Sequence, residues 1–457
     1  MGARRELDFL SLEPILTPDE MSVVDAASGS IEALIERAGW EVASAARRMM
    51  GGTYGRRVVV IAGKGNNGAD GRVAARVLER WGTRTEVVGP ATRHIRDCDL
   101  LIDAGYGTGF RGEFDPPPTR SPVLAVDLPS GLDPLTGEDR GGYNATETVT
   151  FGAWKPGLLL GAGPDRVGTV TVAPIGLRLD AVEPTMWLST DASAAAALST
   201  RAADAHKWTS AVRVIGGSVG MEGAPSLAAA AAMRAGAGMV VVSRPDGAAV
   251  TGLPSETVER RLGDDWVTEA LADASRFGAV VIGPGIGVDD ELFRSTREFV
   301  QRCPVPVVID ADAIRAVAED PTCLTGRSAT SVMTPHDGEF AAFGLPVAAW
   351  RGESVRSLAA LGGVALLKGP TTLVANGVDE CVFVAAGDQR LATAGSGDVL
   401  SGMIAAALAG GTEYPLQSVA AAAHWHGMAG SLTLAGAVAG DVVDAIAPAR
   451  EQMGLAS

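Results

Sequence analysis

Residues 56–89, RRVVVIAGKGNNGADGRVAARVLERWGTRTEVVG, decide the class of fold. The apolar, β-branched run RVVVIA predicts a buried strand, and the glycine-rich GKGNNGADG predicts a turn. The residues after the turn predict a helix, and TEVVG predicts the next strand. Strand, helix and strand in this order are the unit from which parallel sheets are built, so the stretch predicts an α/β fold.

The residues on either side extend this pattern. Residues 17–50 predict two helices, the first with Thr17 as N-cap and Glu20 closing a capping box. Further along, two apolar runs predict strands that end at Asp103 and at Asp127. The alternation of strands and helices predicts a parallel sheet with helices on both faces.

A second series of strands and helices follows residues 180–205, which contain Pro184 and have no clear periodicity. We place a domain boundary there and expect two α/β domains, residues 1–185 and residues 186–457. The two share a fold class but not their motifs, so we do not interpret them as an internal repeat. The second is predicted to have a helix at residues 226–236 and strands at residues 211–217, 238–243, 279–285, 305–313, 330–335, 364–369, 371–376 and 381–386.

Composition and charge limit the classes of function. The chain has 457 residues, 47% of them hydrophobic and 20% charged, which is typical of a globular protein with a large core. The net charge of −16 argues against nucleic acid as a partner. The N-terminus has no apolar signal segment, the apolar runs are too short to span a membrane, and the four cysteines lack metal-ligand spacing. We therefore expect a cytoplasmic protein with reduced thiols.

The turn at residues 63–68, GKGNNG, fits the pattern G-x-G-x-x-G between a strand and a helix. Glu86 lies about where an acid that binds a ribose would be, so the turn alone favours an ordinary dinucleotide dehydrogenase. A single match of this kind is weak evidence. Asn66, Asn67 and Asp70 also crowd the turn with polar side chains, and this argues against the ordinary interpretation.

Three carboxylates are predicted to meet at one edge of this sheet. Asp70 follows the first turn, and Asp103 and Asp127 end two further strands. The carboxyl ends of neighbouring parallel strands face one crevice. The carboxylates would repel one another unless a cation lies among them or one of them takes up a proton. The alternative is that each aspartate caps its own turn.

Four segments of this half resemble the N-terminal domain of the YjeF type: GKGNNGADG, IDAGYGTGFRG, AVDLPSGLDPLTG and TFGAWKPGLLLGAG. The resemblance covers roughly residues 15–178. It implies a Rossmann-like three-layer α/β/α fold and NAD(P)HX epimerase activity, which interconverts the two C6 epimers of hydrated NADH or NADPH. Ala69 departs from the glycine usual in the family.

The same resemblance implies a substrate site and a potassium site. Potassium would lie near Asn67, Asp103 and Ser130, which would answer the crowding of carboxylates. Asp127 is our candidate for the group that moves protons, because it ends a strand close to the implied ligand. The implied substrate-binding residues are Asn66, Asn67, Gly68, Ala69, Asp70, Gly107, Thr108, Gly109, Phe110, Arg111, Gly112, Glu113 and Asp127.

The second half has no Walker A motif, so a nucleotide would be held in another way. Several polar or glycine-rich segments directly follow predicted strands and are expected along one edge of the sheet. Lys368 ends a strand, a position suited to a phosphate, although a solvated turn lysine is the alternative. His336 lies in a turn, where a lone histidine is more often structural. The segments are GPGIG (283–287), DADA (310–313), TPHDGEF (334–340) and KGPTT (368–372).

Residues 391–407, LATAGSGDVLSGMIAAA, predict a glycine-rich turn that opens a helix. Such a turn directs several backbone N–H groups at one point and forms an anion site. Asp398 would repel an anion there unless it takes a proton from a nearby hydroxyl group. The alternative is that Asp398 is an ordinary helix N-cap.

This half resembles the ribokinase-like superfamily and, more closely, the ADP/ATP-dependent NAD(P)HX dehydratases, across roughly residues 204–450. The segments that carry the resemblance are the four above, GSGDVLSGMIAA and the region from His206 to Val240. Trp208, where the family usually has glycine, and Asp337, at a variable position, are departures. The resemblance implies a ribokinase-like α/β/α fold. It implies contacts to the hydrated cofactor from Ala224, Gly285, His336 and Asp398, and to adenine nucleotide from Lys368, Gly369, Pro370, Thr371, Thr372 and Gly397.

The two resemblances together imply a bifunctional repair enzyme. Asp398 would take the proton of the ring hydroxyl while its oxygen attacks the terminal phosphoryl group of ADP or ATP, bound with Mg²⁺, and phosphate would then leave. We expect NADHX or NADPHX as the substrate and a homo-oligomer. One rival is a ribokinase-type kinase of a vitamin precursor with a regulatory N-terminal domain. Another is a dinucleotide sensor without turnover. His424 and His426 are interpreted as packing or surface residues, because a spacing of two places them on different helix faces.

Overall fold

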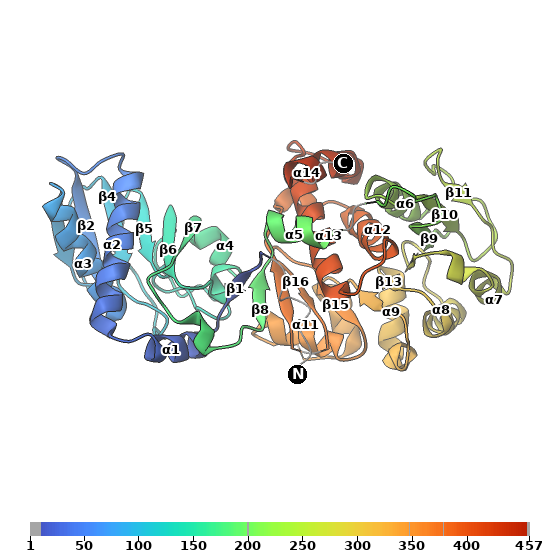
Figure 1. The fold of residues 1–457 in the computed structure, drawn as a ribbon, viewed down its shortest axis with the longest axis horizontal. Coiled ribbons are helices and arrows are strands. Elements are labelled where there is room, and N and C mark those ends of the chain that lie inside the picture. The colour runs from blue at the N-terminus through green and yellow to red at the C-terminus, as the bar shows by residue number, and fades with distance from the viewer. Residues whose placement is uncertain (1–10, 199–200, 347, 378, 455–457) are drawn as a thin grey trace. The chain divides into compact units, whose positions relative to one another are not determined.

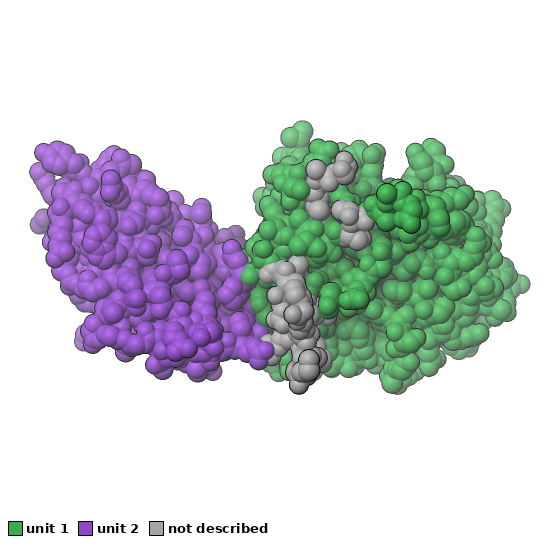
Figure 2. Space-filling model, viewed as in Figure 1, with its two compact units in different colours: residues 1–12, 187–457 green, residues 13–186 purple. Residues whose placement is uncertain are grey.

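The structure is a computed structural model that describes residues 11–198, 201–346, 348–377 and 379–454. It divides into two compact units (Figure 2). The first comprises Glu13–Met186. The second comprises the described residues from Trp187 onward, together with residues 11 and 12. No helix in the described ranges is long and apolar enough to cross a membrane.

The first unit is built on a six-stranded sheet in which all pairs are parallel (Figure 1). This confirms the parallel sheet predicted from the sequence, but β3, β4, β5 and β6 follow one another without an intervening helix, so the prediction of helices on both faces is wrong for this unit. The strand order is β3-β2-β4-β5-β6-β7. The strands are β2 (Arg57–Ala62), β3 (Arg84–Val88), β4 (Leu100–Ala104), β5 (Val123–Val126), β6 (Glu147–Phe151) and β7 (Thr169–Ala173), and β1 (Glu13–Ile15) precedes them.

Helices α2 (Ile31–Met49) and α3 (Asn66–Arg80) cover one face of this sheet (Figure 1). The two helices are in close contact at Gly39, where a Cβ atom would lie only 2.4 Å from the Val73 side chain. The opposite face is packed by loop side chains, among them Phe114 and Tyr143.

Helix α1 (Pro18–Ala27) precedes α2 and begins with the predicted capping box. Glu20 N donates to Thr17 Oγ1 at 3.2 Å, and Thr17 N donates to a Glu20 carboxylate oxygen at 2.7 Å. The four-residue α4 (Gly163–Arg166) follows β6.

The second unit contains a longer sheet with the strand order β8-β17-β16-β15-β14-β13-β12-β9-β10-β11. Strands β15, β16 and β17 pair antiparallel, whereas the pairs from β14 to β11 are parallel. Only residues 368–371 join β15 to β16, too few for the crossover that a parallel pair needs. The strands are β8 (Met186–Leu188), β9 (Ala211–Ile215), β10 (Met239–Ser243), β11 (Val258–Glu259), β12 (Ala279–Ile282), β13 (Val307–Ile309), β14 (Ser331–Met333), β15 (Val364–Leu367), β16 (Thr372–Ala375) and β17 (Cys381–Val384).

Helices cover both faces of this sheet (Figure 1). On one face lie α5 (Asp191–Ala197), α6 (Gly223–Arg234), α12 (Ser396–Ala409), α13 (Pro415–Ser431) and α14 (Ala439–Gln452). A Cβ on Gly402 of α12 would lie 2.1 Å from the carbonyl oxygen of Ala228, so α12 and α6 are in close contact. The remaining helices are α7 (Trp266–Leu271), α8 (Asp290–Arg302), α9 (Asp312–Glu319), α10 (Asp337–Phe340) and α11 (Arg351–Ala359).

Candidate functional sites

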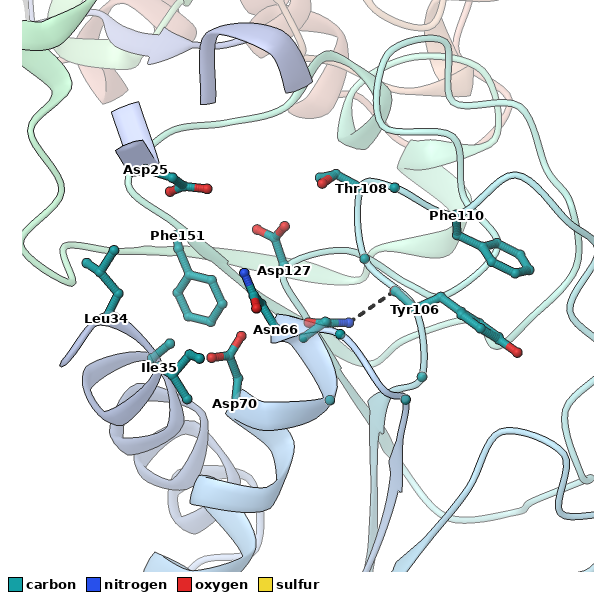
Figure 3. Close-up of a pocket in the computed structure, with 18 of the residues that line it drawn as sticks. Asp25, Leu34, Ile35, Asn66, Asp70, Tyr106, Thr108, Phe110, Asp127 and Phe151 are labelled. Carbon is teal, nitrogen blue, oxygen red and sulfur yellow. Dashed lines mark hydrogen bonds between the residues drawn. The ribbon is translucent and has the colours of Figure 1, made fainter. Parts of the chain in front are cut away.

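The first unit has a cavity of about 870 Å³ at the carboxyl ends of its strands (Figure 3). Most of the predicted substrate-binding residues line it, and those are Asn66, Asn67, Gly68, Asp70, Gly107, Thr108, Gly109, Phe110 and Asp127. Ala69, Arg111, Gly112 and Glu113 are not among the lining residues, nor is Glu86. Arg111 instead stabilises the lining loop, because its guanidinium donates to the carbonyl oxygens of Thr108 and Phe110, both at 2.9 Å.

The cavity is apolar on one side and polar in the middle. Leu34, Ile35 and Phe151 lie together, while Tyr106 and Phe110 lie across from them (Figure 3). The Tyr106 and Phe110 rings are stacked, with centroids 3.9 Å apart. Apolar walls around a few convergent polar groups are typical of a small-molecule site.

Asp127 lies directly after β5 and has a φ of +66°, a conformation that residues other than glycine rarely adopt. Its Oδ1 accepts a hydrogen bond from Lys155 Nζ at 2.6 Å and another from Thr150 Oγ1 at 3.0 Å. Lys155 is buried and also donates to Thr150 Oγ1 at 2.7 Å and to the Phe151 carbonyl oxygen at 3.0 Å. Lys155 lies within a segment quoted for the resemblance, but nothing in the sequence pairs it with Asp127.

Two further carboxyl groups line the cavity with Asp127. Asp70 is 7% exposed and forms no hydrogen bond or ion pair through its side chain with any residue the structure describes. Burial and the nearby Asp127 and Asp25 raise the pKa of Asp70 to about 8. Burial also raises the pKa of Asp25, which lies on α1 and was not identified from the sequence.

Asp103 is placed differently from our prediction. It is fully buried and does not line the cavity. Its carboxylate is instead directed at Ser130 and accepts hydrogen bonds from Ser130 N at 2.9 Å and from Ser130 Oγ at 2.6 Å. Burial raises the pKa of Asp103 in spite of these hydrogen bonds. The prediction that Asp103 joins Asp70 and Asp127 in one pocket is therefore wrong, and the third carboxyl group is that of Asp25.

Asn67 has an unsatisfied buried oxygen. Its Nδ2 donates to the Tyr106 carbonyl oxygen at 3.0 Å, but its Oδ1 has no hydrogen-bond partner in the described part of the chain. Tyr106 N in turn donates to Ser130 Oγ at 2.9 Å. An unpaired buried carbonyl oxygen near a buried carboxylate and hydroxyl is a donor set that suits a hard cation.

In the second unit, the polar segments gather at the carboxyl ends of the strands around Lys368. Its Nζ lies 3.0 Å from Asp310 Oδ1 and 3.6 Å from a Glu339 carboxylate oxygen. Burial alone would lower the pKa of Lys368, but the charges of Asp310 and Glu339 outweigh it and raise the pKa. Thr334 Oγ1 also donates to Asp310 Oδ1 at 2.7 Å. Lys368 is therefore held as a cation inside the site and is not a solvated turn lysine.

The glycine turn lies directly beside this lysine. Gly395 is the N-cap of α12 with a φ of +89°, and a Cβ there would lie 2.5 Å from Leu227, so both conformation and space require glycine. A Cβ on Gly397 would lie 3.3 Å from Lys368 Nζ. The N-terminus of α12 and the ammonium group thus form one cationic corner.

Asp398 lies in the first turn of α12, beside this corner. The N-cap is Gly395 and no side chain caps the helix, so the interpretation of Asp398 as an N-cap is wrong. Burial and the charge of Asp310 raise the pKa of Asp398 to about 7, and Lys368 opposes the rise. A carboxyl group that titrates near neutral pH is suited to general-base chemistry.

The other predicted residues lie in two groups. His336 is the N-cap of α10, where its Nδ1 accepts from Glu339 N at 3.2 Å, and its side chain is 59% exposed. Ala224 lies next to Gly285, since a Cβ on that glycine would be 3.5 Å from the Ala224 Cβ. Arg351 donates to the Lys368 carbonyl oxygen at 3.0 Å and so holds the turn formed by Gly369, Pro370 and Thr371, which leads to Thr372 on β16.

His424 and His426 are both buried, so of the two predicted alternatives they are packing residues and not surface residues. His424 Nε2 lies 2.7 Å from Asp191 Oδ1. His426 forms a hydrogen bond with the backbone of Ser396, behind the glycine turn, and burial lowers the pKa of its imidazole to about 4. Trp208 lies away from the site, with the Arg276 guanidinium 4.0 Å above its ring.

Known proteins match both units. A family model described as NAD(P)H-hydrate dehydratase matches residues 212–448, and one described as the N-terminus of YjeF-related proteins matches residues 31–95 and 85–157. A bifunctional NAD(P)H-hydrate repair enzyme Nnr of Moorella thermoacetica is 34% identical, over 87% of each chain. The enzyme of that name from Mycobacterium tuberculosis is 35% identical, over 83% of this chain and 85% of its own. A ribokinase-like superfamily protein of Enterococcus faecalis shares the fold of the second unit, with a TM-score of 0.52 and 20% identity over 60% of this chain and 99% of its own.

Proposed function

The chain belongs to the family of bifunctional NAD(P)H-hydrate repair enzymes, and from this premise we propose which reaction each half catalyses. Residues 1–185 epimerise NADHX and NADPHX at C6, and residues 186–457 dehydrate the S epimer to NADH or NADPH at the expense of ADP or ATP. The observation that carries this proposal is the position of Asp398, a carboxyl group with a pKa near neutrality, beside the glycine turn and Lys368.

Hydroxide is a poor leaving group, and the dehydratase site converts the hydroxyl group into a phosphate ester, which leaves more readily. Asp398 accepts the proton of the C6 hydroxyl group while the hydroxyl oxygen attacks the terminal phosphorus of the nucleotide. The N–H groups of residues 395–397 and the ammonium of Lys368 stabilise the charge that develops on the transferred group. The C6–O bond then breaks, phosphate leaves, and loss of a C5 proton restores the ring double bond.

The remaining residues of this site position the two ligands. Lys368, Gly369, Pro370, Thr371, Thr372 and Gly397 bind the adenine nucleotide. Ala224, Gly285, His336 and Asp398 contact the hydrated nicotinamide. Mg²⁺ bound with the nucleotide would supply positive charge that neutralises the phosphates. Asp310, Asp312 and Glu339 are the nearby oxygen donors of the type that Mg²⁺ prefers.

The epimerase site is the cavity of the first unit. The predicted residues that line it, residues 66–68, Asp70, residues 107–110 and Asp127, bind NADHX or NADPHX, and Asp127 transfers protons. Asn67, Asp103 and Ser130 would hold potassium, which would supply positive charge near the bound dinucleotide. The unpaired Oδ1 of Asn67 supports this assignment, because a buried carbonyl oxygen without a donor is costly unless a cation or water satisfies it.

Family membership does not favour the kinase of a vitamin precursor. The two hypotheses make different products: the repair enzyme releases NADH and free phosphate, whereas the kinase accumulates a phosphorylated substrate. Incubating the purified chain with NADHX and ADP or ATP therefore tests the proposal. NADH absorbance should return, and no recovery together with phosphorylation of a hydroxymethylpyrimidine or thiazole would overturn it. A cytoplasmic location and a homo-oligomeric state complete the proposal.

A further inference from the structure

Three carboxyl groups face one space in the first unit, and their surroundings differ. Asp25, Asp70 and Asp127 point into the cavity from α1, from α3 and from the end of β5 (Figure 3). Like charges this close cannot all ionise without a cost in free energy. The distribution of hydrogen-bond donors decides which of them carries a proton.

Asp127 has the donors and Asp70 has none. Asp127 Oδ1 receives Lys155 Nζ at 2.6 Å and Thr150 Oγ1 at 3.0 Å, which stabilise the carboxylate form. Within the described chain, the Asp70 side chain is buried without a hydrogen-bond donor or a cationic partner. Two carboxyl groups of one cavity in such different surroundings are a pattern typical of an acid and a base.

We propose that Asp70 and Asp127 are the acid–base pair of the first unit, with Asp70 as the proton donor, Asp127 as the proton acceptor and Lys155 as the positioning residue that holds the Asp127 carboxylate in place. The proposal rests on the epimerase function proposed above and assigns a chemical role to Asp70 and Lys155. Lys155 is suited to its role because it is buried and held by Thr150 and the Phe151 carbonyl oxygen, so its ammonium group stays directed at Asp127.

The pair performs the inversion at C6 in two balanced steps. Asp70 donates its proton to the C6 hydroxyl group, the C6–O bond breaks, water leaves, and the ring nitrogen lone pair forms a C=N bond to C6. A water molecule on the opposite face of the ring then adds its oxygen to C6, and its proton passes to the Asp127 carboxylate while the electron pair returns to nitrogen. Proton exchange with solvent restores Asp70 and Asp127.

The other titratable groups of the cavity fit these assignments. Asp25 adds negative charge near Asp70 and further favours its protonated form. Lys64, at the turn before α3, lines the cavity but forms no ion pair within the described residues, and Tyr106 stacks on Phe110. Lys155 is thus the cation bound directly to a carboxylate of this cluster, and it selects Asp127 as the base.

The test measures epimerisation of R-NADHX by the full chain without nucleotide, where dehydration does not proceed. Asp70→Asn should lower kcat by about 100-fold or more with KM within threefold, and Asp70→Glu should regain part of the rate. In the wild type, the rate should fall above pH 8 as Asp70 loses its proton. Lys155→Met should lower kcat with KM within threefold, because the Asp127 carboxylate loses the ammonium group that holds it in place, and Lys155→Arg should regain part of the rate. Asp115→Asn, an exposed control in the same unit, should change nothing.

The outcomes separate the two proposals. If the wild type does not epimerise R-NADHX, the proposed function of the first unit is wrong. If the wild type is active but Asp70→Asn keeps its kcat within threefold, or if Lys155→Met keeps the wild-type kcat, the acid–base assignment is wrong. Dehydration of S-NADHX by each variant reports whether the chain is folded. Should Asp70→Asn lose that activity too, the rate regained by Asp70→Glu and the fall in kcat at unchanged KM in Lys155→Met decide.

Discussion

The ammonium nitrogen of Lys368 lies 3.0 Å from Oδ1 of Asp310, although 58 residues separate them in the chain. Each follows the end of a strand, β15 for the lysine and β13 for the aspartate, so the sheet brings the pair together. The same ammonium group lies within reach of the glycine turn and opposes the high pKa of Asp398. Lys368 therefore links the nucleotide end of the site to its base.

Replacing Lys368 with Met should weaken nucleotide binding and raise the pKa of Asp398. The first effect follows from the loss of a phosphate-binding cation, and we expect KM for the nucleotide to rise more than about tenfold, equivalent to about 1.4 kcal/mol. The second should move the acid limb of the dehydration rate to higher pH. Steady-state kinetics across pH measure both. Lys207→Met, an exposed lysine outside the site, serves as the control; equal effects in the two variants would contradict the role of Lys368.

Asp398→Asn should abolish dehydration without unfolding the chain. The loss of a general base predicts a fall in turnover of about 100- to 10,000-fold, with nucleotide binding little changed. Stability should not fall at neutral or alkaline pH. A carboxyl group whose pKa is raised in the folded state holds its proton there more tightly than in the unfolded chain, so the free energy of unfolding decreases as pH rises from about 4 to about 7. The Asn variant should lack this decrease, and denaturant unfolding at pH 4, 6 and 8 measures it.

The pH dependence of dehydration should follow Asp398 in the free enzyme. Because the base must be unprotonated to accept a proton, kcat/KM for S-NADHX should decline below pH about 7. The epimerase reaction should instead decline above pH about 8, where Asp70 loses its proton. The dehydration rate thus declines toward acidic pH, whereas the epimerisation rate declines toward alkaline pH. Profiles of the same shape for both reactions would contradict the assignment of separate groups to the two sites.

Potassium should stabilise the first unit and support epimerisation alone. A cation that binds the native state and not the unfolded chain raises the melting temperature, and tighter binding raises it further. Exchanging K⁺ for Li⁺ should therefore lower Tm and slow epimerisation of R-NADHX, while dehydration of S-NADHX keeps its rate. Asn67→Ala removes the unpaired Oδ1 and should make Tm insensitive to K⁺. If the K⁺ dependence survives in Asn67→Ala, the cation binds elsewhere.

Local sequence patterns predicted the framework but not the partners of the site residues. The strand–turn–helix at residues 56–80 and the cap at Thr17 follow from short-range preferences, and the structure contains both. Asp25 and Lys155 were missed because they reach the cavity from α1 and from the loop after β6, and no local signal joins them to Asp127. Asp103 was misplaced for a similar reason: its partner Ser130 lies 27 residues away, and only the folded sheet brings them together.

The most direct test of two activities on one chain uses a mixture of R- and S-NADHX with ADP or ATP. The wild type should return the NADH absorbance of the whole mixture. Asp127→Asn should rapidly return only the part that was present as the S epimer, since the R epimer then converts at its uncatalysed rate. Complete recovery by Asp127→Asn at the wild-type rate would contradict the division of labour between the two units, and no recovery by the wild type would contradict the repair function itself.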